Sequence, residues 1–218
     1  LRSYCRYLIR LGELDVDPVG KVLKPKMNKR VPQFVDQKAI NLLLDEYEFG
    51  DDFPGFRNRL IINLLYQTGM RRGELVGMTV SSVDIVQGTI KVMGKRSKER
   101  IIPVGREICH DLTDYLVKRK EIATEQQETF FLTEKGRPIY PKLIYRIVTR
   151  YIGMVSTLEK TSPHILRHTF ATHMLNSGAD LNAIKEILGH ANLSSTQVYT
   201  HNTFEKLKTI YKQAHPRA

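Results

Sequence analysis

The sequence predicts a mainly α-helical fold with a small antiparallel β-sheet, an α+β arrangement. Across most of the chain, apolar residues recur at spacings of three and four, the period of an amphipathic helix. Residues 83–104 break this rhythm with short β-branched runs separated by QG and GKRSK, which predicts strands joined by two turns. A composition of 41% hydrophobic and 26% charged residues excludes a disordered chain.

The charge balance points to a polyanionic partner. Lys and Arg number 34 against 23 Asp and Glu, a net charge of +11, which favours nucleic acid or an anionic surface. The two cysteines, Cys5 and Cys109, cannot form a disulfide scaffold or a thiolate zinc cluster, so a cytoplasmic setting is expected. No run approaches the roughly 18 apolar residues of a membrane span, and membrane insertion is not expected.

The first residues form an element of their own. Leu1, Tyr4, Leu8 and Leu11 share one side of a helix that is already under way at residue 1 and ends near Gly12. Residues 15–32 contain three prolines, several lysines and no periodicity, which favours an interdomain linker over a long surface loop. We therefore divide the chain into residues 1–14, 15–32 and 33–218.

The helices of the main domain follow from their apolar spacing. The expected cores lie at residues 39–44, 60–65, 108–120 and 143–152, with a short strand candidate at FFL, residues 130–132. Ser162 and Pro163 have the types of an N-cap and first helical residue, and the helix they begin is expected to run to Gly178. Asp180 is expected to cap a second helix that ends at Gly189.

Two further helices are expected near the C-terminus. Ser194 and Gln197 have the spacing of a capping box for a short helix that contains Tyr199. The stretch 204–214 is amphipathic, with Leu207 and Tyr211 on one side.

The helix beginning at Pro163 contains a group of polar side chains near its positive end. His164, Arg167 and His168 project within about a third of the circumference at 3.6 residues per turn, an arrangement that suits an anion such as phosphate. Zinc is an alternative, since His164 and His168 are four apart, but Arg167 would place a fixed positive charge against the cation. A solvated helix end is the third interpretation.

A second group lies in the segment TGMRRGEL. Arg71 and Arg72 follow a glycine that can end the preceding helix, and Glu74 can hold Arg71 by an i, i+3 pair. Arg71 and Arg167 can then form two sides of a clamp for the non-bridging oxygens of a phosphate. The alternative is that the arginine pair is ordinary surface charge.

The turn GKRSKER is strongly basic. Lys95, Arg96, Lys98 and Arg100 stand against one acid, Glu99, so this sheet tip either contacts nucleic acid or is simply solvated. Lys95 adjoins the strand TIKVM, and a lysine held there can donate a proton to a leaving oxygen.

Tyr199 is a candidate nucleophile and, equally, a candidate packing residue. A phenol with an ordinary pKa near 10 is a poor nucleophile unless neighbours help to remove its proton. His190 and His164 are candidates for that role, although spacing alone does not bring them together.

A basic helix face is expected at residues 143–152. Lys142, Tyr145, Arg146 and Arg150 can reach a DNA major groove from this helix, or form a solvated face.

Four ordered motifs resemble the catalytic domain of the tyrosine recombinase (phage integrase) family, and most closely the bacterial Xer recombinases. They are LLYQTGMRRGELVGM, GKRSKERIIPVG, SPHILRHTFATHMLNSGADLNAIKEILGH and LSSTQVYTH, and the similarity extends from about residue 30 to the final HPRA. The resemblance implies phosphate-clamping roles for Arg71 and Arg167, with Glu74 as the accompanying acid. It also implies that Lys95, His164 and His190 are catalytic, with Tyr199 as the nucleophile.

The activity implied by the resemblance is site-specific cleavage and rejoining of DNA through a 3′-phosphotyrosyl intermediate, without cofactor, metal or ATP. The implied partners are a double-stranded recombination site, a homo- or hetero-tetramer, and a DNA translocase as a candidate activator, all in the bacterial cytoplasm. Residues 1–14 resemble the last helix of a truncated N-terminal core-binding (SAM-like) domain. Residues 203–218 resemble a segment exchanged between neighbours, with packing inside one chain as the alternative.

The resemblance leaves the biological context open. Xer-like chromosome dimer resolution, as part of cell division, and integration or excision of a mobile element use the same active site. A catalytically inactive integrase-like DNA-binding protein is the main alternative function. A metal-dependent nuclease built on the histidines of HILRH is a further one.

Overall fold

The computed structural model describes residues 1–22, 33–94, 99–158, 161–189 and 201–217, and for residues 201–204 it describes the backbone alone. The chain divides into two units, Leu1–Pro32 and Gln33–Ala218. The smaller unit contains helix α1, Arg2–Arg10, whose C-cap Leu11 is followed by Gly12 with a φ of 75°, so the helix ends near Gly12 as the sequence predicts. Leu1, Tyr4 and Leu11 are exposed on it, while Cys5 is buried.

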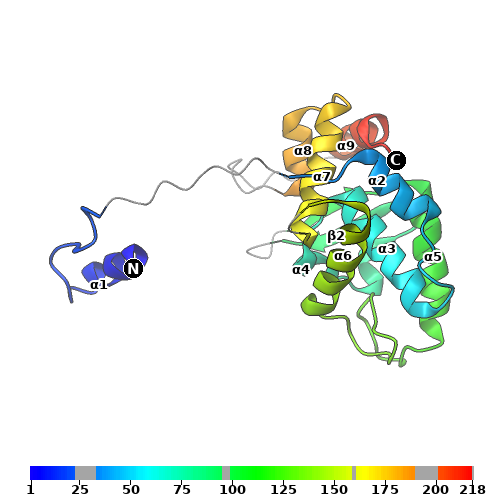
Figure 1. The fold of residues 1–218 in the computed structure, drawn as a ribbon, viewed down its shortest axis with the longest axis horizontal. Coiled ribbons are helices and arrows are strands. Elements are labelled where there is room, and N and C mark those ends of the chain that lie inside the picture. Colours follow the sequence, from blue (N-terminus) through cyan, green and yellow to red (C-terminus); the bar gives the residue numbers. More distant parts are fainter. Residues whose placement is uncertain (23–32, 95–98, 159–160, 190–200, 218) are drawn as a thin grey trace. The chain divides into compact units, whose positions relative to one another are not determined.

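The larger unit is built around α3, Phe53–Thr68 (Figure 1). The side chain of Asp52 caps this helix by accepting a hydrogen bond from the Gly55 backbone N–H at 2.8 Å. Every residue from Leu60 to Thr68 is buried, and α3 packs against α5, α6 and α7. A central helix of this kind is buried on all sides rather than along one stripe, and its buried polar residues pair, with Nε2 of Gln67 donating to Oδ1 of Asn63 at 2.9 Å.

The other helices surround α3. Their bounds are α2 Gln37–Asn41, the π-helical turn η1 Leu42–Glu46, α4 Arg72–Val76, the 3-10 turn η2 Val80–Ser82, α5 Arg106–Lys120, α6 Pro141–Val155, α7 Pro163–Asn176, α8 Leu181–Leu188 and α9 His201–Ala214. The four helical regions expected from apolar spacing are therefore confirmed. Figure 1 shows α7, α8 and α9 gathered at one end of the unit, where they pack on one another.

The predicted sheet is confirmed. Strands β1 Val83–Asp84, β2 Thr89–Met93 and β3 Glu99–Pro103 pair antiparallel in the order β1-β2-β3. Ile90 pairs with Ile102 and Val92 with Arg100, and all four side chains are buried. This face therefore points into the domain, while Lys91 and Glu99 form an exposed ion pair of 2.7 Å on the other face.

The prediction of a strand at FFL, residues 130–132, is wrong. Phe130, Phe131 and Leu132 are each fully buried, so the segment lacks the alternation of a strand with one wet face. Its backbone contacts separate parts of the fold: the Phe130 N–H donates to the Met78 carbonyl and the Leu132 N–H to the Tyr115 hydroxyl. The segment makes only isolated bridges within the part of the chain that is described.

The ends of α7 and α8 follow the sequence closely. α7 begins at Pro163, although the Ser162 side chain does not make the expected capping hydrogen bond. Gly178 adopts a φ of 85° after α7. The Asp180 side chain caps α8, and Gly189 ends it in the left-handed conformation. The short helix expected around Ser194 lies outside the described residues.

The C-terminal segment packs on its own domain. Leu207 and Tyr211 of α9 are buried, and the Tyr211 hydroxyl donates to Oε1 of Gln67 on α3 at 3.2 Å. After α9, the His215 ring stacks on Tyr211, and Arg217 forms ion pairs of 2.8 Å with Asp45 and with Glu107.

Candidate active site

The end of α3 positions the first arginine. Gly69 ends the helix with a φ of 58°, and a β-carbon there would lie 2.6 Å from side-chain atoms of Leu188 and Phe170. This turn is therefore pressed against α7 and α8, where only glycine fits. Arg71, two residues further on, is the N-cap of α4, and its backbone N–H donates to Oε2 of Glu74 at 2.7 Å. The predicted i, i+3 pair is present, with Nη1 of Arg71 2.9 Å from Oε1 of Glu74.

A third residue, Arg100, completes this contact. Its Nη1 and Nη2 donate to the two carboxylate oxygens of Glu74 at 2.7 and 2.8 Å. Arg100 is only 5% exposed, so the sequence-based assignment of this residue to a surface DNA contact does not fit the structure. The physical reason is strand alternation, because Arg100 stands two residues before the buried Ile102 and shares its face. That alternation was a usable signal in the sequence.

The carboxyl end of α8 binds three arginines. The carbonyl of Ile187 accepts from Nε of Arg100 at 2.8 Å, that of Leu188 from Nη2 of Arg167 at 2.7 Å, and that of Gly189 from Nη2 of Arg71 at 3.2 Å. Carbonyls at a helix C-terminus lack intrahelical partners and lie at the negative end of the helix dipole, which suits cationic donors. Arg167 also donates to the Gly69 carbonyl at 2.7 Å.

These residues, Arg71, Arg100, Arg167 and Glu74, form what we call the arginine cluster. Burial lowers the pKa of Arg167 to about 10, and the charges of Arg71 and Arg100 add to that effect. Burial alone would raise the pKa of Glu74, but hydrogen bonds from Arg100 and Arg71 bring it below its ordinary value. The cluster holds three positive charges against one negative charge, so it can stabilise an added anion. The Arg71 side chain, 31% exposed, gives access to it.

The histidines of α7 lie differently from the sequence-based expectation. His164 and His168 are exposed, whereas Arg167 turns inward to its carbonyl partners and does not share their face. Lys95, Arg96, Lys98, His190 and Tyr199 all lie outside the described residues. The described part of the domain thus brings together Arg71, Glu74 and Arg167 from the predicted set.

The described residues show neither a metal-ligand cluster nor a membrane-spanning helix. They contain no group of three or more His, Cys, Asp or Glu side chains that could hold a metal ion. Within the same part of the chain, no helix has the length and apolar character that crossing a membrane requires.

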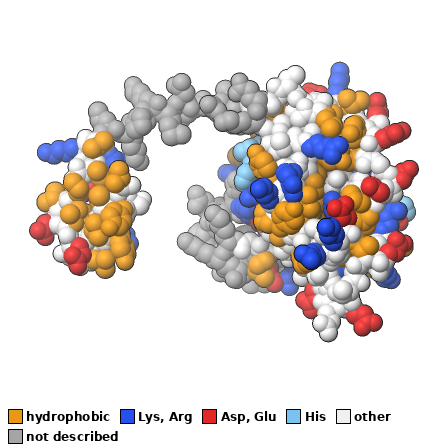
Figure 2. All heavy atoms as spheres, turned by 60° about the horizontal axis from the view of Figure 1, so that its bottom comes forward, with side chains coloured by type: hydrophobic (Ala, Val, Ile, Leu, Met, Phe, Trp, Pro, Cys, Tyr) orange, Lys and Arg blue, Asp and Glu red, His pale blue; other side chains and the backbone are white. Residues whose placement is uncertain are grey.

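A basic surface surrounds the first half of α6. Lys142, Tyr145, Arg146 and Arg150 are all exposed, in agreement with the expected basic face. Figure 2 shows one side of the molecule on which lysine and arginine side chains lie among hydrophobic ones.

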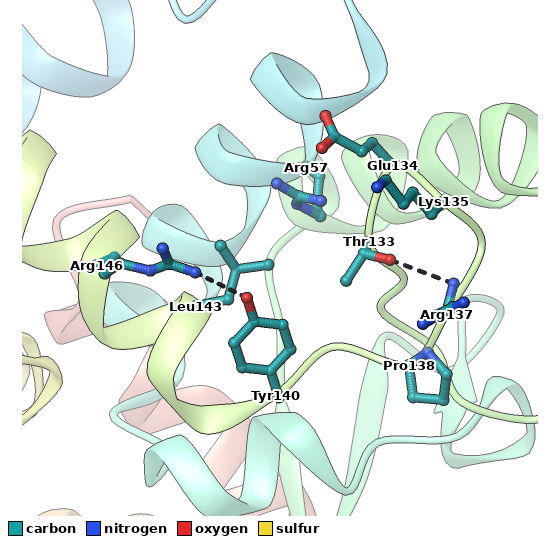
Figure 3. Close-up of a pocket in the computed structure, with 9 residues that line it drawn as sticks. All are labelled: Arg57, Thr133, Glu134, Lys135, Arg137, Pro138, Tyr140, Leu143 and Arg146. Atoms are coloured by element: carbon teal, nitrogen blue, oxygen red, sulfur yellow. Dashed lines mark hydrogen bonds between the residues drawn. The ribbon is translucent and has the colours of Figure 1, made fainter.

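A hollow of about 500 Å³ adjoins this surface (Figure 3). Four cationic residues and one acidic residue line it, together with uncharged ones; the charged residues are Arg57, Lys135, Arg137, Arg146 and Glu134. In Figure 3 Arg146 reaches the Tyr140 hydroxyl, to which its Nη2 donates at 2.7 Å. None of the residues that line the hollow belongs to the arginine cluster.

Comparisons with known proteins agree with these features. The model of the phage integrase family matches residues 33–206. The tyrosine recombinase XerC of Chlorobaculum parvum is 38% identical over 239 residues, covering 100% of this chain and 71% of its own. The XerD recombinase of Halalkalibacterium halodurans is 37% identical, covering 100% of this chain and 73% of its own.

Solved structures show the same fold. The XerA recombinase superposes with a TM-score of 0.66 at 30% identity, covering 95% of this chain and 72% of its own. The XerH site-specific recombinase bound to its difH substrate in a pre-cleavage complex gives 0.67 at 27% identity, covering 90% and 59%. The chain therefore belongs to the phage integrase family of tyrosine recombinases.

Proposed function

We propose that the chain is a site-specific DNA recombinase that cleaves and rejoins strands through a covalent 3′-phosphotyrosyl intermediate. The arginine cluster is the observation that supports this most directly, because the Arg71 and Arg100 guanidiniums share the Glu74 carboxylate while backbone carbonyls hold the Arg167 guanidinium beside them. A phosphodiester under attack gains negative charge on its non-bridging oxygens, and fixed arginines in a water-poor site stabilise that charge.

In the proposed reaction, the phenolic oxygen of Tyr199 attacks the scissile phosphorus. The new bond joins Tyr199 to phosphorus while the bond between phosphorus and the 5′-oxygen breaks. His190 or His164 takes the phenolic proton, and Lys95 donates a proton to the departing 5′-oxygen. A 5′-hydroxyl of another strand then attacks in reverse. The phosphotyrosyl bond conserves the energy of the phosphodiester, so the reaction consumes no nucleotide.

We propose double-stranded DNA as the partner. Lys142, Arg146 and Arg150 on α6, with the cationic hollow beside them, are suited to phosphate contacts, and Tyr145 to a contact with a base edge. Arg96 and Lys98 of the sheet turn are further candidates. Chromosome dimer resolution and mobile-element integration both fit this chemistry.

Two proposals concern the ends of the chain. The exposed apolar side chains of α1 fit the last helix of a core-binding domain at residues 1–14, with 15–32 as linker.

In a DNA-bound tetramer, residues 203–218 would exchange between neighbours and reuse the contacts that Tyr211 and Arg217 make here within one chain. Cysteines introduced as Arg217→Cys and Glu107→Cys, joined by a bismaleimide linker, should connect two chains on DNA. Links confined to single chains on DNA would contradict exchange.

The activity is tested with a suicide substrate. The protein first selects its site from a random-sequence DNA pool, and that site is then built into a duplex with a nick beside the scissile phosphate. Cleavage releases a short fragment, which traps the covalent complex. We expect a DNA adduct that survives denaturant with wild-type protein and with Tyr7→Phe, an exposed tyrosine on α1, and none with Tyr199→Phe.

The other outcomes identify the alternatives. Specific binding with no adduct in wild type would mean an integrase-like DNA-binding protein. An adduct that persists in Tyr199→Phe would exclude Tyr199 as the nucleophile. Loss of cleavage in EDTA would favour the metal-dependent nuclease.

A further inference from the structure

We propose that Arg100 is a positioning residue for DNA cleavage: it fixes Glu74, and through Glu74 it holds Arg71 in the orientation that binds the scissile phosphate. This inference rests on the function proposed above. It gives a role in the reaction to a residue that the sequence placed on the DNA-contacting surface.

Arg100 is not itself placed to bind the phosphate, because it is buried and its side chain already binds protein groups. Three of its five N–H donors are used, Nε on the Ile187 carbonyl and one from each terminal nitrogen on Glu74, and the side chain is 5% exposed. Arg71 differs, because it is 31% exposed and makes only single hydrogen bonds from Nη1 and Nη2. Arg71 therefore keeps donors for a ligand, while Arg100 is committed to the protein.

Glu74 connects the two arginines. Its Oε1 accepts from Nη1 of both Arg71 and Arg100, and its Oε2 accepts from the Arg71 backbone and from Nη2 of Arg100. Four hydrogen bonds fill the acceptor capacity of a carboxylate and fix its plane. Without Arg100, half of these bonds are lost and the carboxylate can rotate, so Arg71 loses its fixed support.

Arg100 also joins three parts of the fold. It stands on β3 opposite Val92 of β2, contacts Glu74 of α4, and contacts Ile187 at the end of α8. The contact with α8 is close, since a β-carbon on Gly189 would lie 3.0 Å from Cδ of Arg100. Arg100 thus links the strand pair β2–β3 to α4 and α8.

The test uses single-turnover cleavage of the suicide duplex by Arg100→Met and Arg100→Lys. We expect the methionine variant to cleave about 100-fold more slowly, the scale seen when a positioned group is misplaced. The lysine variant should be at least about 10-fold slower, because an ammonium cannot make the bidentate contact. The Kd for DNA should stay within about 2-fold, since Arg100 is only 5% exposed. Lys91→Met, which breaks the exposed ion pair of the same sheet, should cleave like wild type.

Two modified substrates separate the positioning of Arg71 from general damage to the site. A methylphosphonate at the scissile position lacks one charged non-bridging oxygen and so has less need of Arg71. With one of its two diastereomers, the defect of Arg100→Met should shrink to within about 5-fold of wild type. A 5′-bridging phosphorothiolate, whose leaving group needs no proton, should leave the defect unchanged.

The outcomes are distinct. If wild type forms no adduct, the proposed function fails before Arg100 is tested. If wild type cleaves and both Arg100 variants cleave within 2-fold of it, or if the defect is equal on all three substrates, the inference is wrong. If Arg100→Met does not fold by circular dichroism, Arg100→Met with Glu74→Met removes both buried charges. That double variant should then match Glu74→Met alone in rate, and a double variant that cleaves clearly more slowly than Glu74→Met would overturn the role of Arg100.

Discussion

Glu74→Gln should destabilise the domain strongly although it replaces only one carboxylate oxygen with an amide nitrogen. The carboxylate is 4% exposed and accepts from Arg71 and Arg100, and the amide that replaces it keeps one acceptor oxygen and adds a donor facing cations. Breaking a buried ion pair by removing one partner costs about 3–5 kcal/mol. For a unit of this size each kcal/mol lowers Tm by roughly 2–4 °C, so the expected decrease is roughly 6–20 °C.

Thermal unfolding followed by circular dichroism measures this effect. The matched control is Glu99→Gln, which breaks an ion pair whose carboxylate side chain is 48% exposed and should cost at most about 1 kcal/mol. The pKa of Glu74 lies below its ordinary value, so its stabilising contribution is present above the unfolded-state pKa and is lost as pH falls through the folded-state pKa. The difference between wild type and Glu74→Gln should therefore be full at pH 7 and decrease in acid below about pH 4.5. A Tm within about 2 °C of wild type at pH 7 would refute this reasoning.

Three further predictions follow from the same structure. Gly189→Ala and Gly178→Ala should each lower the free energy of unfolding in urea by about 1–2 kcal/mol, because both glycines have positive φ. Only Gly189→Ala should slow cleavage, since its β-carbon would contact Arg100. Burial lowers the pKa of His215 to about 3, so protonation favours the unfolded chain below pH 6.5. Wild type should lose about 2 kcal/mol more than His215→Phe between pH 6.5 and 5, and equal losses would contradict this. Arg146→Gln on α6 should reduce the salt slope of DNA binding by about 1, whereas Lys120→Gln on α5 should not.

The sequence predicted the helices, the sheet and the helix ends well because these depend on local patterns. Gly69 and Gly189 end their helices in the left-handed conformation, and the i, i+3 pair of Arg71 with Glu74 is a local contact. The prediction of a strand at residues 130–132 was wrong because a short apolar run does not distinguish a strand from another fully buried segment.

The rest of the candidate site depends on contacts between distant segments. Arg100 is 26 residues from Glu74 in sequence, and Arg167 is 98 from the Gly69 carbonyl that it binds. Periodicity on α7 placed Arg167 with His164 and His168, but hydrogen bonds to two carbonyls outside the helix turn its side chain inward. A sequence pattern does not show which distant backbone carbonyl a side chain will bind. This part of the arrangement is therefore visible only in the folded chain.

The carboxyl end of α8 explains why these distant arginines converge. Three successive carbonyls at residues 187–189 each accept from a different guanidinium, and a helix end supplies such acceptors in a fixed geometry. Repulsion among these three neighbouring cations is thereby offset by backbone dipoles and by one carboxylate, which leaves positive charge available for a phosphate. His190 follows Gly189 directly in the chain, and Tyr199 comes nine residues later. Substitutions that disturb this helix end should therefore impair the arginine cluster and the start of the proposed nucleophile segment together, whereas substitutions on α6 should weaken DNA binding alone.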